Sequence, residues 1–168
     1  MVSIHGSCEP GFEAVADAFH ANFTEHDDIG AAVCVYHRGR PVVDLWGGDA
    51  DREGGRPWEH DTIQLVFSTT KGMAATCVHM LVERGELDLE APIATYWPEF
   101  AAAGKADIPL HWVLSHQAGM AAVTAEVTMD DVLGWDGIVS AIAEQAPVWE
   151  PGTAHGYHAR TYGWILGE

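Results

Sequence analysis

Basic residues are scarce in this sequence, and their scarcity excludes several functions. The 168 residues contain 8 lysines and arginines against 25 aspartates and glutamates, which gives a formal net charge of −17 at pH 7. Such a surface repels nucleic-acid phosphates and anionic membranes. Long apolar runs are missing as well, and the N-terminus lacks the basic and apolar regions of a secretory signal peptide. We therefore expect neither nucleic acid nor a membrane among the partners.

Cysteine is rare too, and its spacing excludes two common uses. Cys8, Cys34 and Cys77 are odd in number, lie far apart and form no C-x-x-C pair. A disulfide framework or a structural zinc site would need paired or closely spaced cysteines. The pattern instead fits reduced thiols and a cytoplasmic location.

Histidine, in contrast, is abundant, with ten residues. The closest groups are His111 with His116 and His155 with His158. A metal site would need a third ligand and a helix or strand to hold it. We therefore favour polar loop and surface histidines, and we expect no metal.

The order of the periodic segments predicts an α+β fold with an antiparallel sheet. The chain is 48% hydrophobic and 20% charged, which indicates a globular domain with a core. Apolar spacing predicts a helix over residues 10–24, and residues 29–36 and 41–48 read as the two strands of a hairpin. Further helices are predicted over 68–84, 88–98, 110–115 and 129–145 and from 157 onward, with a mobile polar loop over 49–61.

An isolated hairpin is only marginally stable and leaves both of its edges unpaired. The sequence also ends inside an apolar helical pattern. We therefore expect residues 1–168 to be the N-terminal part of a longer domain, with a helix and hairpin at 10–48 and a nucleophile helix and helical region at 62–168. A complementing C-terminal chain and a homo-oligomer stay open as other ways to complete the sheet.

The motif S-x-x-K at residues 68–71 is the strongest chemical signal in the chain. Ser68 and Lys71 are three residues apart and share one helix face, and Ala75, Val78 and Val82 continue the same line as an apolar stripe. A desolvated ammonium loses its proton more readily and can act as a base. A serine at a helix N-terminus lies where backbone N–H groups stabilise an oxyanion.

This motif also occurs by chance, and most copies are a helix cap with a solvated lysine. Three further segments favour catalysis, because together with the motif they resemble the serine β-lactamase-like superfamily. This group includes class C β-lactamases, D-alanyl-D-alanine peptidases and family VIII carboxylesterases. Residues 85–92 are similar to its G-x-L-x-L-D-x-P segment, residues 114–120 to its L-T-H-x-S-G-L segment, and the Pro-Gly loop at 150–153 with Tyr157 to its tyrosine motif.

The resemblance implies a role for each matching residue. Ser68 would be the acylated nucleophile, and its backbone N–H would form part of the oxyanion hole. Lys71 would be the base, or would keep the base deprotonated. Tyr157 would relay a proton to the leaving group, although a tyrosine at that position could also be a partly buried core residue. Such an enzyme needs no cofactor, and its substrate would be a small carboxylic ester.

Two departures from the family pattern bear on function. Ala159 stands where the family's Y-x-N motif has an asparagine that binds the substrate amide in β-lactamases, which favours esters over lactams. The late K-T-G motif has no counterpart in these residues. We therefore expect a carboxylesterase-like serine hydrolase. The alternatives are a catalytically incompetent fragment that needs a partner chain, and a β-lactamase or D-alanyl peptidase-like activity.

Overall fold

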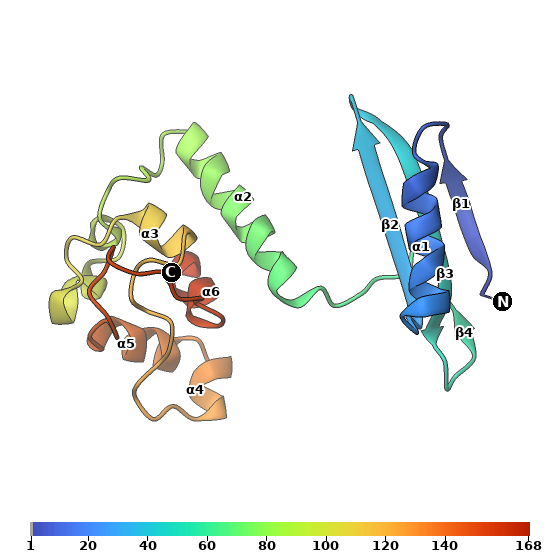
Figure 1. Ribbon diagram of the computed structural model, residues 1–168. Coiled ribbons are helices and arrows are strands. Elements are labelled where there is room, and N and C mark those ends of the chain that lie inside the picture. Colours follow the sequence, from blue (N-terminus) through green and yellow to red (C-terminus); the bar gives the residue numbers. More distant parts are fainter. Residues whose placement is uncertain (1) are drawn as a thin grey trace. The chain divides into compact units, whose positions relative to one another are not determined.

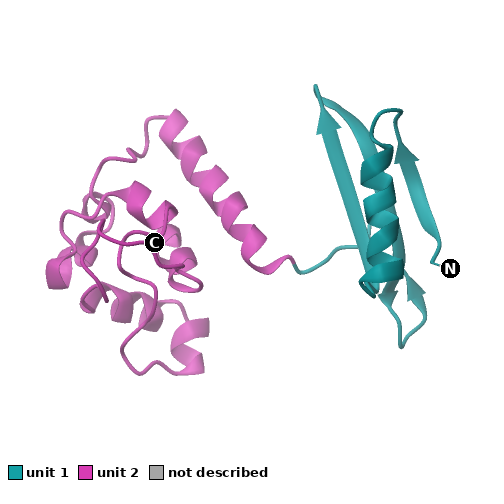
Figure 2. Ribbon diagram, viewed as in Figure 1, with its two compact units in different colours: residues 1–65 teal, residues 66–168 magenta. Residues whose placement is uncertain are grey.

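The structure, a computed structural model, describes residues 2–168. The chain forms two compact units, residues 1–65 and residues 66–168 (Figure 2). No helix among the described residues is both long and apolar enough to cross a membrane.

The first unit is an antiparallel sheet with one helix against it (Figure 1). Its elements, in chain order, are β1 (Ile4–Cys8), α1 (Glu13–Glu25), β2 (Gly30–His37), β3 (Arg40–Asp51) and β4 (Arg56–Pro57). The strand order is β1-β3-β2, and β4 pairs with the end of β3. The long strand β3 therefore lies in the middle, which is why its apolar residues are the most buried of the sheet.

The period-2 pattern of β3 builds the core of this unit. Val43 and Leu45 point to one face, where Val35 and Val33 of β2 are their partners in the register. Phe19 of α1 is buried in the same cluster. One face of the sheet is thus covered by α1. Val42, next to Val43 in β3, is buried as well, so β3 does not alternate strictly between core and solvent.

The prediction of two strands was incomplete. Residues 4–8 form β1, which pairs with β3 over five positions. Part of the predicted mobile loop over 49–61 is also strand, because β3 continues to Asp51 and turns back into β4. The hairpin is therefore not isolated, and β3 is paired on both sides.

The second unit is helical (Figure 1). It contains the short 3₁₀ helices η1 (Phe67–Thr69), η2 (Ile93–Thr95) and η3 (Pro98–Gly104) and the helices α2 (Thr70–Glu83), α3 (Leu110–Leu114), α4 (Met129–Leu133), α5 (Asp136–Glu144) and α6 (Thr161–Gly167). Its core includes five fully enclosed side chains: Phe100, Val113, Met120, Ile138 and Ile142.

The prediction of a single helix over 129–145 was wrong. Thr128 starts α4 through a capping box with Asp131, and the helix ends after only five residues. Trp135 has a φ of +70°, a left-handed conformation that cannot continue a helix, and α5 begins after it. The apolar periodicity runs through this break, which is why the sequence did not reveal it. The region predicted as helical over 88–98 contains η2, and the last helix begins at Thr161 and not at residue 157.

Lys105 is a buried cation in the core of the second unit. Its side chain is inaccessible to solvent. The Nζ donates hydrogen bonds to the carbonyls of Ala102, at 2.8 Å, Ala143, at 2.9 Å, and Gln145. Two of these acceptors close the C-terminal end of α5, where helix carbonyls have no partner of their own. Lys105 thus stabilises the end of α5 from a position about 40 residues away in the sequence.

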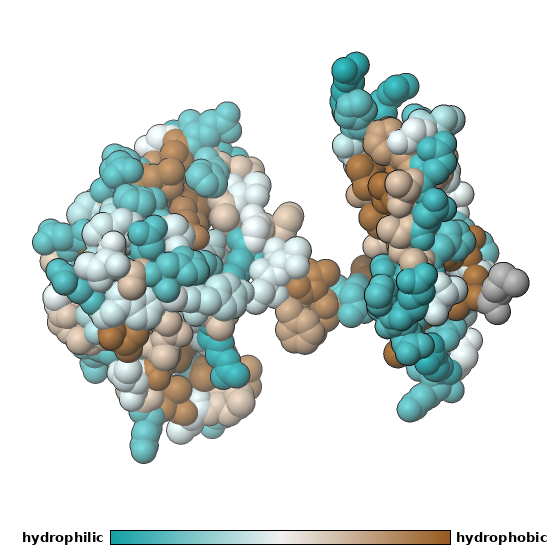
Figure 3. Space-filling model, in the orientation of Figure 1, coloured by the Kyte–Doolittle hydropathy of each residue, from teal (hydrophilic) through white to brown (hydrophobic). Residues whose placement is uncertain are grey.

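Apolar side chains also lie on the surface of both units (Figure 3). Four large exposed ones are consecutive or nearly so just before Ser68: Ile63, Leu65, Val66 and Phe67. None of them belongs to either hydrophobic core.

Candidate active site

Ser68 and Lys71 lie at the junction of η1 and α2. Ser68 is exposed within the 3₁₀ turn, and Lys71 is in the first turn of α2 and half-buried. The Nζ of Lys71 lies 3.1 Å from the Oγ of Ser68, within hydrogen-bonding distance. Phe67, directly before the serine, has a φ of +44°, a strained conformation of the kind found at active-site turns.

The amine of Lys71 is held from a second direction. It donates a hydrogen bond of 2.7 Å to the carbonyl of Ala159, 88 residues away in the sequence. It also lies 4.9 Å from the ring centre of Tyr157 and 5.8 Å from that of Tyr162. Farther along α2, Val78 is buried, so Lys71 does head the inward side of this helix as the sequence predicted.

Tyr157 comes from the loop before α6 and meets both residues. Hydrogen bonding with Ser68, then with Lys71, lowers the pKa of the Tyr157 phenol, and the charge of Lys71 adds to the effect. The side chain is 49% exposed, so it is not the core tyrosine of the alternative interpretation. A phenol with a lowered pKa can both accept and donate a proton closer to neutral pH.

The structure thus brings together the three residues chosen from the sequence, all within the second unit. Their catalytic roles, and the role of the Ser68 N–H in an oxyanion hole, stay predictions. The arrangement offers a hydroxyl, an amine that contacts it and a phenol beside both, which are the nucleophile and acid–base groups that acyl transfer through a serine uses.

Sequence reasoning missed the histidines next to this group. His158 was assigned to the surface, but its side chain is fully buried. His116, which is half-buried, packs its ring against those of Tyr157 and Tyr162, with centroids 4.8 and 5.3 Å apart. The proximity of His155 and His158 to Tyr157 in the sequence was the available signal. Within residues 2–168, no three histidine, cysteine or acidic side chains form a group that could hold a metal ion.

A pocket of about 700 Å³ has Ala159 in its lining but none of Ser68, Lys71 and Tyr157. Ala159, whose carbonyl binds Lys71, lines it together with Val123, Val127, Arg160 and Trp164. The side chain of Ala159 is a methyl group and carries no hydrogen-bonding atom. The lining is mainly apolar but also includes Arg160 and Thr161, which follow Ala159 in the sequence.

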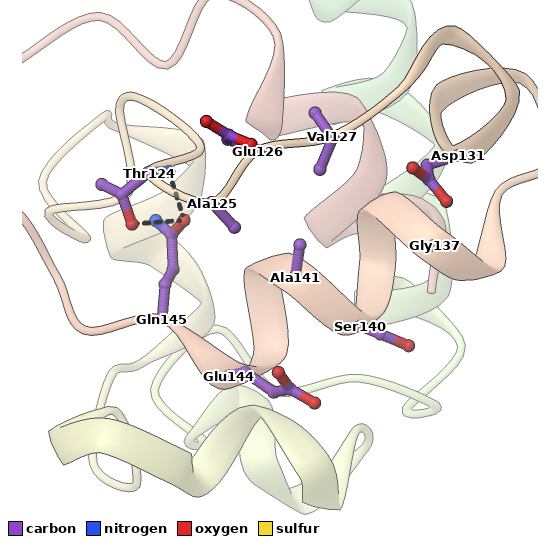
Figure 4. Close-up of a pocket in the computed structure, with 10 residues that line it drawn as sticks. All are labelled: Thr124, Ala125, Glu126, Val127, Asp131, Gly137, Ser140, Ala141, Glu144 and Gln145. Carbon is purple, nitrogen blue, oxygen red and sulfur yellow. Dashed lines mark hydrogen bonds between the residues drawn. The ribbon is translucent and has the colours of Figure 1, made fainter.

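A second pocket, of about 450 Å³, lies between the loop at 124–127 and α5 (Figure 4). None of Ser68, Lys71 and Tyr157 lines it. Gln145 accepts hydrogen bonds from the backbone and the hydroxyl of Thr124, and its amide donates to the carbonyl of Ala122. These hydrogen bonds hold the 122–124 loop against the end of α5.

A family model described as Beta-lactamase matches residues 15–168, and the chain belongs to this family. Among curated proteins, the esterase/beta-lactamase LipL of Mycobacterium tuberculosis is 43% identical over 166 residues, which cover 97% of this chain and 38% of LipL. Esterase EstB of Burkholderia gladioli is 38% identical over 96 residues, 55% of this chain and 24% of EstB.

Solved structures agree with this assignment. A family VIII carboxylesterase superimposes with a TM-score of 0.92 at 49% identity, covering 98% of this chain and 45% of that one. A penicillin-binding protein homologue from Caulobacter crescentus has a TM-score of 0.93 at 39% identity, covering 98% and 44%. The predicted β-lactamase-like α+β fold is confirmed. The chain spans less than half the length of each of these relatives, so it holds only part of their fold.

Proposed function

We propose that the polypeptide containing these residues is a serine hydrolase that cleaves short-chain carboxylic esters through an acyl-enzyme on Ser68. The observation that carries the proposal is the 3.1 Å contact between Ser68 Oγ and Lys71 Nζ, with the same amine anchored on the Ala159 carbonyl. A nucleophile and its base in direct contact, the base oriented by a third group, form the usual arrangement of covalent catalysis. The esterase names of the relatives support the same class of reaction.

In the proposed reaction, Ser68 Oγ attacks the ester carbonyl and its proton passes to Lys71 or to the Tyr157 phenolate. The bond between the carbonyl carbon and the alkoxide oxygen then breaks, and Tyr157 gives a proton to the departing alcohol. Water attacks the acyl-enzyme in the second half, and the same groups take its proton and return one to Ser68. The balance is one ester and one water consumed for one acid and one alcohol.

The preference for esters over lactams follows from residue 159. An alanine has no side-chain amide to bind the amide of a lactam substrate. Apart from Arg160 and Thr161, the pocket that Ala159 lines is apolar, which suits a short acyl chain. The structural likeness to a penicillin-binding protein homologue makes β-lactam acylation the second candidate. We expect a simple ester to turn over faster than nitrocefin, and the reverse result would favour this second candidate.

The test is acylation in the full-length polypeptide. The wild type should give a burst with p-nitrophenyl acetate and should be labelled by a fluorophosphonate, and Ser68→Ala should abolish both. Ser140→Ala is the matched control, because Ser140 is also an exposed helical serine but lies on α5. Equal labelling of Ser68→Ala and the wild type would remove Ser68 from the mechanism. The same assay on residues 1–168 alone measures whether this part is active without a partner chain.

A further inference from the structure

His116 accepts hydrogen bonds from the backbone on both sides of Tyr157. Its carbonyl accepts a hydrogen bond of 3.1 Å from the N–H of Gly156, the residue before the tyrosine. Its Nδ1 accepts another, also of 3.1 Å, from the N–H of His158, the residue after it. The imidazole ring meets the Tyr157 ring edge to face, with centroids 4.8 Å apart. One residue thus fixes the backbone on either side of the phenol and one face of its ring.

His158 provides the reciprocal connection. Its buried ring accepts a hydrogen bond of 3.0 Å at Nε2 from the N–H of Met120, and its Nδ1 lies 2.6 Å from the Gly156 carbonyl, to which it donates. The hydroxyl of Thr161 donates to the Met120 carbonyl. Each of the two loops, 116–120 and 156–158, therefore contributes a histidine whose ring accepts a hydrogen bond from the backbone of the other loop.

This arrangement works only with neutral imidazoles. Nδ1 of His116 and Nε2 of His158 are acceptors, and a protonated ring has no acceptor nitrogen. The titratable and charged groups that face His116 are His155, His158, Tyr157, Tyr162 and Lys71. Burial lowers the pKa of His116, and His158, His155 and Lys71 lower it further, so the ring is neutral at physiological pH.

We propose that His116 is a positioning residue that holds the Tyr157 phenol in its place beside Ser68 and Lys71. Tyr157 lies in a loop without regular secondary structure, so its position depends on contacts from other elements. The contacts from His116 are the ones that touch both its backbone neighbours and its ring. The inference rests on the proposed function, because it assigns a purpose to the orientation of Tyr157.

Two substitutions separate the effect of the hydrogen bond to Nδ1 from the effect of the ring contact. His116→Asn places an oxygen acceptor near the position of Nδ1 but removes the ring and the titration. His116→Phe keeps a ring against Tyr157 but removes the acceptor. His155→Ala is the matched control, because His155 is an exposed neighbour of His116 whose removal leaves the bonds to Gly156 and His158 intact.

We expect His116→Phe in the full-length polypeptide to lower kcat for p-nitrophenyl acetate about 10- to 100-fold with little change in KM, because misplaced catalytic groups typically cost up to about 100-fold. His116→Asn should recover most of this loss. His155→Ala should match the wild type, because the hydrogen bonds of His116 to Gly156 and His158 stay intact. The acid limb of the kcat/KM profile should move to lower pH in His116→Asn, because that variant keeps an acceptor that cannot be protonated.

A second readout does not depend on hydrolysis. The phenol of Tyr157 can be titrated by ultraviolet difference spectroscopy against a Tyr157→Phe baseline, and its pKa should return toward its ordinary value in His116→Phe. An unchanged kcat together with an unchanged Tyr157 titration in His116→Phe would overturn the proposal. If His116→Phe does not fold, the test is the acid limb of the kcat/KM profile of His116→Asn. An acid limb at the same pH as in the wild type would refute the role of His116. Failure of the proposed function would appear separately, as acylation that survives Ser68→Ala.

Discussion

Replacing Lys105 by methionine should destabilise the second unit through the end of α5. Methionine has a similar length and fills the same space, but it cannot donate to the three carbonyls that Lys105 binds. A hydrogen bond to a charged group contributes about 1.5–3 kcal/mol to stability, so the loss of the three bonds alone would lower the free energy of unfolding by roughly 5–9 kcal/mol. Part of it is offset because burying an ammonium itself costs several kcal/mol. We expect Lys105→Met to lower the free energy of unfolding by about 2–4 kcal/mol.

The assay is urea unfolding of the full-length polypeptide, followed by tryptophan fluorescence, with hydrogen exchange as a local readout. The amide of Thr124 should exchange faster in Lys105→Met, because Gln145, which accepts its hydrogen bond, follows α5 directly. Arg84→Met is the control, since Arg84 is an exposed residue at the end of α2, and a surface change of this kind stays within about 0.5 kcal/mol. A Lys105→Met stability within the same margin of wild type would show that the three carbonyls find other partners and that the reasoning is wrong.

Three further predictions concern the site. Lys71→Met should slow acylation by p-nitrophenyl acetate about 10²- to 10⁴-fold in stopped-flow measurements, the usual contribution of a positioned acid–base group, and a loss of less than tenfold would contradict its role as base. Ser68→Ala and Lys71→Met should each raise the pKa of Tyr157 toward its ordinary value, because they remove the hydrogen bonds that lower it; ultraviolet titration against Tyr157→Phe measures this, and a phenol unmoved by both changes would exclude these bonds. Burial, the largest effect, lowers the pKa of His158 below 6.5, so the folded state binds fewer protons than the unfolded state. The free energy of unfolding should therefore be highest above about pH 6.5 and fall as the pH drops through the folded pKa, with a shallower fall in His158→Gln. Urea unfolding at several pH values measures this, and equal pH dependence in the two proteins would argue against it.

Helix α2 could be predicted from the sequence because its signals are local. Ser68 and Lys71 are one turn apart, and the apolar line through Val78 fixes the inward side of the helix within a few residues. The same is true of β2 and β3, whose valines lie on either side of a glycine turn. In these segments the side-chain period and the tertiary environment agree.

Strand β1 could not be predicted in this way. Its residues 4–8 include Gly6, with a φ of +106°, and a Cβ at that position would lie 1.9 Å from the Asp44 carbonyl oxygen. The segment is a strand because β3 pairs with it, not because its own composition favours one. The break between α4 and α5 is the opposite case: the apolar period is continuous, and the left-handed backbone at Trp135 interrupts the helix nevertheless.

The contrast between the two halves of the site explains why only one of them was fully visible in the sequence. Ser68 and Lys71 share a turn and a helix, whose own hydrogen bonds fix their spacing. Tyr157 has no such support, and the bonds that hold its loop come from residues about 40 positions away. Histidine can accept such a bond at one nitrogen and donate at the other, as His158 does, but only while it is neutral. Because both imidazoles must be neutral to accept these bonds, we expect the placement of the Tyr157 phenol to depend on pH.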